Sequence, residues 1–146
     1  MNDKQTISSK NLILIPKNGI ILKKILVIDD DYASCLVLNE YLNEFGVDTI
    51  TEKDGKKALP LLKAHPDIDL IFLDLFLHDS SGYEICKKIK ILMPELPVIA
   101  YTACFTLDVE KKCYKTGFDD ILYKPVRYEK IYKIIMKYNN LKLSMN

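Results

Sequence analysis

The chain has 146 residues, a net charge of +1, 49% hydrophobic residues and 28% charged residues. These values suit one globular domain with its own core, and the balanced charge gives no basic excess that would indicate a nucleic-acid partner. No apolar stretch approaches the roughly 20 residues of a membrane helix, and the N-terminus lacks the apolar core of a secretory signal. We therefore expect a cytoplasmic protein with neither nucleic acid nor a membrane as its partner.

The first 23 residues are expected to form an arm. Apolar runs at 12–15 and 20–22 flank Pro16-Lys17-Asn18-Gly19. An Asn-Gly pair between apolar runs favours a hairpin, whereas Pro16 and the polar start of the chain weaken that interpretation. We predict a flexible arm with some local β structure.

Beyond the arm, short apolar runs bounded by turn residues alternate with stretches of helical periodicity. This alternation repeats a strand–helix unit five times, which is typical of a parallel sheet with helices on both faces. The expected strands are 25–28, 47–51, 70–74, 98–101 and 120–123, and the expected helices are 32–45, 55–64, 83–93, 107–116 and 127–139.

Three of these helices carry a local signal of their own. Asp31 is a plausible N-cap of the first. Pro60 lies inside the second, where proline costs about 3 kcal/mol, so we expect either a kink or a helix that begins near Leu59. The helix at 107–116 has few apolar positions, which predicts that it is loosely held, and Gly117 should end it.

Polar side chains end four of the five predicted strands. Asp29 and Asp30 follow the first, Asp74 ends the third, Thr102 follows the fourth and Lys124 follows the fifth. Each signal alone is weak, because an acidic pair after a strand is more often a helix cap, and a lone Asp is usually a turn residue. Together they indicate a site, because the carboxyl ends of parallel strands share one edge, where ligands bind.

The residue types at this edge indicate the chemistry. Two carboxylates at about 4 Å repel by about 4 kcal/mol at an effective dielectric constant near 20, so a divalent cation would stabilise the cluster. Oxygen ligands that leave room for water favour Mg²⁺. A lysine and a threonine that face the same point suit a phosphoryl group.

From about 24 to 139, the sequence resembles the receiver domain of two-component response regulators, the domain of the bacterial chemotaxis regulator. The motifs are Ile-Leu-Val-Ile-Asp-Asp-Asp at 25–31, Leu-Ile-Phe-Leu-Asp-Leu at 70–75, Ser-Gly-Tyr-Glu at 81–84, Val-Ile-Ala-Tyr-Thr-Ala at 98–103 and Lys-Pro at 124–125. The resemblance implies an α/β fold: a flavodoxin-like, doubly wound (βα)5 three-layer sandwich with a parallel five-stranded sheet in the order 2-1-3-4-5. It divides the chain into an arm at 1–23, a receiver domain at 24–141 and a tail at 142–146.

The resemblance also implies a role for each residue at the edge. Asp74 is expected to be the phosphoacceptor, while Thr102 and Lys124 contact the phosphoryl oxygens. The family usually has a cis peptide before the proline, here Pro125. The resemblance implies a Mg²⁺ site formed by the side chains of Asp29, Asp30 and Asp74 and the backbone carbonyl of Phe76, with assistance from the backbone amides of Leu75 and Ala103.

Two departures from the family pattern affect the expected mechanism. His78 occupies the place of a loop proline, where it could be a ligand or an acid–base group, although a solvent-exposed loop residue is favoured. Ile121 stands where the family commonly has Tyr or Phe, a ring that turns inward when the threonine moves. We therefore expect activation to shift the loop at 103–106 and the helix at 107–116 while the Ile121 rotamer stays unchanged.

The resemblance implies a single-domain response regulator that takes a phosphoryl group from a histidine kinase or a histidine phosphotransfer protein. It would signal to a protein partner through 107–116, 120–123 and 127–139, because only seven residues follow Asn139 and a DNA-binding output domain does not fit there. It would catalyse only its own aspartyl phosphorylation and dephosphorylation. Two alternatives stay open, namely the receiver portion of a hybrid sensor histidine kinase and a non-phosphorylated receiver-like interaction module. A haloacid-dehalogenase-type phosphatase is disfavoured because that family needs a second Asp where Phe76 stands.

Overall fold

A parallel five-stranded sheet forms the centre of the computed structural model, which describes residues 6–7, 14–15 and 19–145. The strand order β4-β3-β5-β6-β7 is the predicted order 2-1-3-4-5, and the α/β flavodoxin-like fold is confirmed. The strands are β3 (Lys24–Ile28), β4 (Asp48–Glu52), β5 (Ile68–Leu73), β6 (Val98–Thr102) and β7 (Asp120–Tyr123). The helices are α1 (Tyr32–Glu44), α2 (Ala58–Ala64), α3 (Gly82–Leu92), α4 (Leu107–Thr116) and α5 (Tyr128–Ser144).

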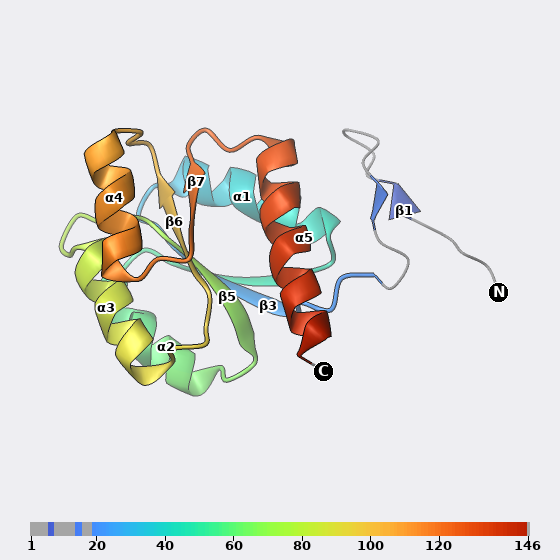
Figure 1. The fold of residues 1–146 in the computed structure, drawn as a ribbon, viewed down its shortest axis with the longest axis horizontal. Coiled ribbons are helices and arrows are strands. Elements are labelled where there is room, and N and C mark those ends of the chain that lie inside the picture. Colours follow the sequence, from blue (N-terminus) through green and yellow to red (C-terminus); the bar gives the residue numbers. More distant parts are fainter. Residues whose placement is uncertain (1–5, 8–13, 16–18, 146) are drawn as a thin grey trace.

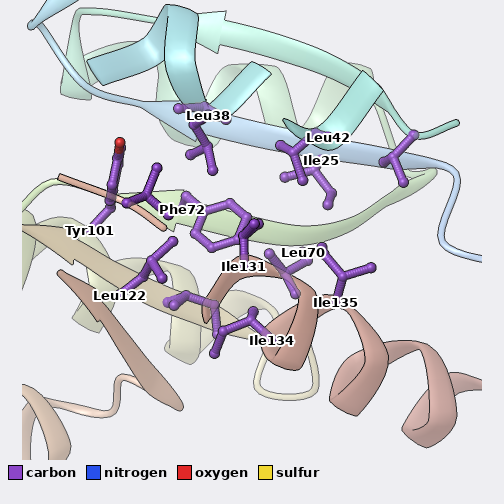
Figure 2. Close-up of a cluster of buried hydrophobic side chains, with 14 of the residues drawn as sticks. Ile25, Leu38, Leu42, Leu70, Phe72, Tyr101, Leu122, Ile131, Ile134 and Ile135 are labelled. Atoms are coloured by element: carbon purple, nitrogen blue, oxygen red, sulfur yellow. The ribbon is translucent and has the colours of Figure 1, made fainter. Parts of the chain in front are cut away.

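Helices cover both faces of the sheet, with α1 and α5 on one face and α2, α3 and α4 on the other (Figure 1). Successive residues of one strand therefore enter different cores. Ile25 and Val27 of β3 pack in the cluster beneath α1 and α5, whereas Leu26 and Ile28 pack in the other. Figure 2 shows the first cluster, where Phe72 lies among side chains of both helices. This double burial is why the strand sequences are continuous apolar runs.

Several predicted helix boundaries are confirmed. Asp31 caps α1, since its Oδ2 accepts from the Ser34 N–H at 3.2 Å. A 3₁₀ turn, η1 (Gly55–Lys57), precedes α2, which begins at Ala58. Pro60 is then the third helical residue, where no intrahelical acceptor awaits an N–H, so the later start replaces a kink. Gly117 ends α4 with a φ of 121°, and Cys113 is the one buried residue of that helix.

The predicted end of the last helix is wrong, because α5 continues beyond 139 to Ser144. Asn139 is fully buried, and its Oδ1 accepts from the N–H groups of Ile21 (2.7 Å) and Leu22 (3.2 Å). Its Nδ2 donates to the Gly19 carbonyl at 3.3 Å. Asn139 thus holds the segment that leads into β3 instead of ending the helix.

Local β structure occurs in the arm, but with a different pairing from the hairpin that the sequence suggests. β1 (Thr6–Ile7) pairs antiparallel with β2 (Leu14–Ile15), whereas 20–22 lies outside any strand. Residues 16–18, in the suggested turn, lie outside the described residues. The division into arm, receiver and tail stays a prediction. No helix in the described part of the chain has the length and apolar character needed to cross a membrane.

The Asn139 contacts predict a stability difference between neighbouring asparagines. Asn139→Ala leaves two backbone N–H groups without their acceptor, and a buried unsatisfied donor costs about 1–3 kcal/mol. We expect urea denaturation to show that the free energy of unfolding falls by about 2 kcal/mol or more. Asn140 is exposed, so the control Asn140→Ala should change the same quantity by about 0.5 kcal/mol at most. Equal effects of the two substitutions would contradict the proposal that Asn139 holds the segment that leads into β3.

Candidate functional site

The polar residues predicted to share one edge of the sheet come from four neighbouring strands. Asp29 directly follows β3 and Asp74 directly follows β5, and the parallel register places these two strand ends side by side. Thr102 ends β6 opposite the last residue of β7, and Lys124 comes next in the chain. The topology therefore converts distant sequence positions into neighbours, as expected for the carboxyl edge of a parallel sheet.

Three carboxylates gather at this edge. Asp29, Asp30 and Asp74 each offer an oxygen, and these oxygens lie within 4.8 Å of one another. Asp29 and Asp74 are 1% and 7% exposed, whereas Asp30 is open to solvent. At this separation, two ionised carboxylates repel by about 3–4 kcal/mol at an effective dielectric constant near 20. The cluster therefore favours a bound cation.

Lys124 supplies one positive charge to the cluster. Its Nζ lies 2.6 Å from Asp29 Oδ2 and 3.4 Å from Asp74 Oδ2, and 4.9 Å from the centre of the Tyr101 ring. Burial opposes the charged form, but the hydrogen bonds and negative charges of Asp29 and Asp74 together outweigh it and raise the pKa of Lys124. The peptide between Lys124 and Pro125 is cis, as predicted. One ammonium among three acids leaves the cluster with a net negative charge.

The buried carboxyl of Asp29 resists ionisation. Burial raises the pKa of this carboxyl from its usual 3.8 to about 6. The hydrogen bond from Lys124 and that from the Asp31 N–H, at 2.9 Å, lower the pKa and offset only part of this effect. The ionised form of Asp29 is therefore disfavoured in the folded chain, because burial outweighs its contacts with Lys124 and the Asp31 N–H.

The loop after β5 adds backbone donors that the sequence motifs did not indicate. The Phe76 N–H donates to Asp74 Oδ1 at 3.2 Å, and the His78 N–H donates to Asp30 Oδ2 at 2.7 Å. The His78 side chain is 87% exposed, which confirms the solvent-exposed interpretation. A Cβ at Gly82 would lie 2.2 Å from the Asp74 carbonyl oxygen, so only glycine allows this close approach.

Thr102 is fully buried and faces the loop that follows it. Its Oγ1 accepts from the Cys104 N–H at 3.2 Å, and its carbonyl accepts from the Lys124 N–H at 2.8 Å. The structure thus brings Asp29, Asp30, Asp74 and Lys124 together and places Thr102 beside Lys124. The roles of these residues and of the Phe76 carbonyl stay predictions at this point.

The fold and the site define a receiver-type signalling domain, and comparison with known proteins identifies the family. The family described as the response regulator receiver domain matches residues 25–136. Sporulation initiation phosphotransferase F of Bacillus subtilis is 33% identical over 121 residues, which are 82% of this chain and 96% of that protein. The chain belongs to the response regulator receiver domain family.

Solved structures agree with this assignment. A two-component response regulator from Clostridium difficile is 29% identical, with a TM-score of 0.74 and coverage of 80% of this chain and 94% of that one. A chemotaxis protein of Vibrio cholerae, 21% identical, shares the fold with a TM-score of 0.73 and coverage of 80% and 98%.

Other relatives are much longer than this chain. Hybrid signal transduction histidine kinase L of Dictyostelium discoideum is 31% identical over 81% of this chain, which spans 7% of that protein. Histidine kinase 3 of Arabidopsis thaliana is 27% identical over 87% of this chain, which spans 14% of its length. The activities of those whole proteins are therefore not transferred to this chain.

The raised pKa of Asp29 predicts how its contribution to stability depends on pH. The folded chain holds this proton more tightly than the unfolded chain, so the stabilisation is fully present below about pH 4 and is lost as the pH rises through about 6. Asp29→Asn removes this titration. In EDTA, the variant should therefore gain stability relative to the natural chain between about pH 4 and pH 7, measured by urea denaturation. A difference that is constant with pH would show that Asp29 titrates normally.

Proposed function

We propose that this chain acts as a response regulator receiver in a two-component system or phosphorelay in the cytoplasm. It accepts a phosphoryl group on Asp74 from a histidine kinase or a histidine phosphotransfer protein. The observation that carries this proposal is the position of Asp74, which is 7% exposed and lies within reach of two further carboxylates and the Lys124 ammonium. In these surroundings the Asp74 carboxylate is a nucleophile, and the Lys124 ammonium beside it neutralises negative charge.

The residues present fit a Mg²⁺ ion. The donors are all oxygen atoms, and the three carboxylates offer oxygens within 4.8 Å of one another. Burial also disfavours the ionised form of Asp29, which a cation would stabilise. The ion would be held by the side chains of Asp29, Asp30 and Asp74 and by the backbone carbonyl of Phe76, in keeping with the preference of Mg²⁺ for a few carboxylates and water. When bound, it supplies charge neutralisation to the phosphoryl oxygens.

The remaining steps belong to the chain itself. The Phe76 N–H fixes the orientation of the Asp74 carboxylate through Oδ1. A carboxylate oxygen attacks the phosphorus of phosphohistidine, so that a P–O bond forms while the P–N bond breaks. Lys124, now divided between Asp29 and Asp74, pairs with a phosphoryl oxygen, and the Thr102 hydroxyl donates to another. Catalysis here is positioning and charge neutralisation.

The proposed output is a protein partner that binds the surface formed by α4, β7 and α5. The contacts between Thr102, Lys124 and the loop at 103–106 lie between the acids and this surface. A phosphoryl group can bias the protein only through contacts that differ between its two states. These contacts are the ones that change when Thr102 and Lys124 turn to the phosphoryl oxygens.

The proposed acceptor can be tested by intact mass spectrometry. With Mg²⁺ and acetyl phosphate, the natural chain should gain one phosphoryl group, and Asp74→Asn should gain none because the nucleophile is absent. Asp79 is an exposed carboxylate in the same loop, so Asp79→Asn is the matched control and should gain the group normally. Labelling that persists in Asp74→Asn would place the acceptor elsewhere.

The proposed metal site can be tested by thermal unfolding. Mg²⁺ binds the folded chain, so millimolar Mg²⁺ should raise the melting temperature by mass action. Asp30→Asn should remove most of this gain, and it should leave the chain in EDTA at least as stable because repulsion is relieved. Asp79→Asn should keep the full gain. A melting temperature that ignores Mg²⁺ in the natural chain would exclude the site.

A further inference from the structure

A surface pocket of about 520 Å³ lies between the loop after β6, the end of β7 and the start of α5. Its apolar walls include Phe105, Tyr123 and Ile134, and Lys124 also lines it. Arg127, Lys130 and Lys133 are exposed and also line it. Among the residues that the structure describes, no carboxylate lines this pocket.

The acids close to the pocket do not neutralise its rim. Asp120 accepts from Lys137 Nζ and from the Tyr138 hydroxyl, both at 2.7 Å, and is thereby satisfied by α5. Glu110 of α4 lies near the Tyr123 hydroxyl, where it contributes to the raised pKa of that phenol after the larger effect of burial. The pocket therefore combines an apolar interior with a cationic rim, which complements an acidic segment that carries an apolar anchor.

Two aromatic rings that contact each other line the pocket. The Phe105 and Tyr123 ring centres are 5.1 Å apart with an interplanar angle of 57°, and Phe105 is 64% exposed. An aromatic pair of this kind adds only a modest stabilisation beyond its buried area, so a change at the site can break it. Ile121 lines the same pocket but offers no ring.

The residue that carries each ring is connected through the backbone to a residue of the site. Phe105 follows Cys104, whose N–H donates to Thr102 Oγ1. Tyr123 is the sheet partner of Thr102 and directly precedes Lys124. If the Thr102 side chain moves toward a phosphoryl oxygen, its Oγ1 moves away from the Cys104 N–H, and the backbone that carries Phe105 can rearrange.

We propose that this pocket binds an acidic segment of a partner protein through an aromatic or aliphatic anchor, and that the Phe105–Tyr123 ring pair couples its affinity to phosphorylation of Asp74. The ring pair transmits a movement of Thr102 to the pocket, which Ile121 cannot do through a ring. Phosphorylation tightens binding. The coupling rests on the proposed function, whereas the binding of an acidic segment by the pocket does not.

The pocket can be tested with labelled synthetic peptides and fluorescence anisotropy. The probe is a short peptide of Asp and Glu residues around one Phe, and its two controls replace the Phe by Ser or every acid by its amide. The probe should bind more tightly than both controls. The double variant Lys130→Glu and Lys133→Glu should weaken its binding by about tenfold or more. The matched charge reversal Lys63→Glu, at an exposed position of α2, should change it by about twofold at most.

Equal binding of the three peptides, or equal effects of the charge reversals, would overturn the assignment of an acidic partner. Analytical ultracentrifugation tests the rival occupant. If the natural chain self-associates and the double variant does not, a second copy of the chain occupies the pocket and the proposal is wrong.

The coupling is tested by repeating the titration with Mg²⁺ and beryllofluoride. The natural chain should bind the probe about fivefold or more tightly in the activated state. Phe105→Leu and Tyr123→Leu should lose most of this gain while still gaining a phosphoryl group from acetyl phosphate, and Ile121→Leu should keep it. A gain that survives in both ring variants and disappears in Ile121→Leu would refute the ring-pair mechanism. If the natural chain gains no phosphoryl group, the proposed function fails, while the peptide experiment still decides the pocket.

Discussion

The ion pairs of Lys124 are the interaction on which the rest of the site depends. One ammonium lies 2.6 Å from Asp29 and 3.4 Å from Asp74, and both carboxylates are almost fully buried. Moving charges out of water is costly, so such a group is stable only where partners are held in place. The parallel sheet provides this constraint, because it fixes the ends of β3, β5 and β7 along one edge.

The same contacts explain why the site is poised for a change of state. Asp29 and Asp74 share one ammonium, and burial disfavours the ionised form of Asp29 and raises its pKa to about 6. The phosphoryl group proposed for Asp74 would add further negative charge, which would increase the need for a cation and draw Lys124 toward the new group. The Lys124 N–H donates to the Thr102 carbonyl. A shift of either residue therefore changes the positions of the ends of β6 and β7.

Much of the fold could be predicted from the sequence because its signals are local. Continuous apolar runs report strands buried on both faces, Asp31 and Gly117 mark helix ends, and Pro60 correctly indicates a late helix start. The order of the strands came from the family resemblance, since periodicity does not rank strands within a sheet. The convergence of Asp29, Asp74 and Lys124 followed from their place after parallel strands.

The features that the sequence did not predict depend on contacts between distant or backbone groups. Asn139 has a modest helix propensity and looks like a helix end, but its partners are backbone N–H groups 117 and 118 positions away. The amides that hold Asp30 and Asp74 carry no side-chain signal, because any residue supplies an N–H. The Phe105–Tyr123 contact joins a loop to a strand, and apolar periodicity does not predict the geometry of a loop.

The central conclusion is that burial disfavours the ionised form of Asp29, despite its ion pair with Lys124, until a divalent cation binds. It is tested most directly by ¹³C NMR titration of the Asp29 side-chain carboxyl, with resonances assigned through Asp29→Asn. We expect the pKa of Asp29 to be about 6 in EDTA and to fall below the usual 3.8 in saturating Mg²⁺. A pKa near 3.8 in EDTA that Mg²⁺ leaves unchanged would contradict it.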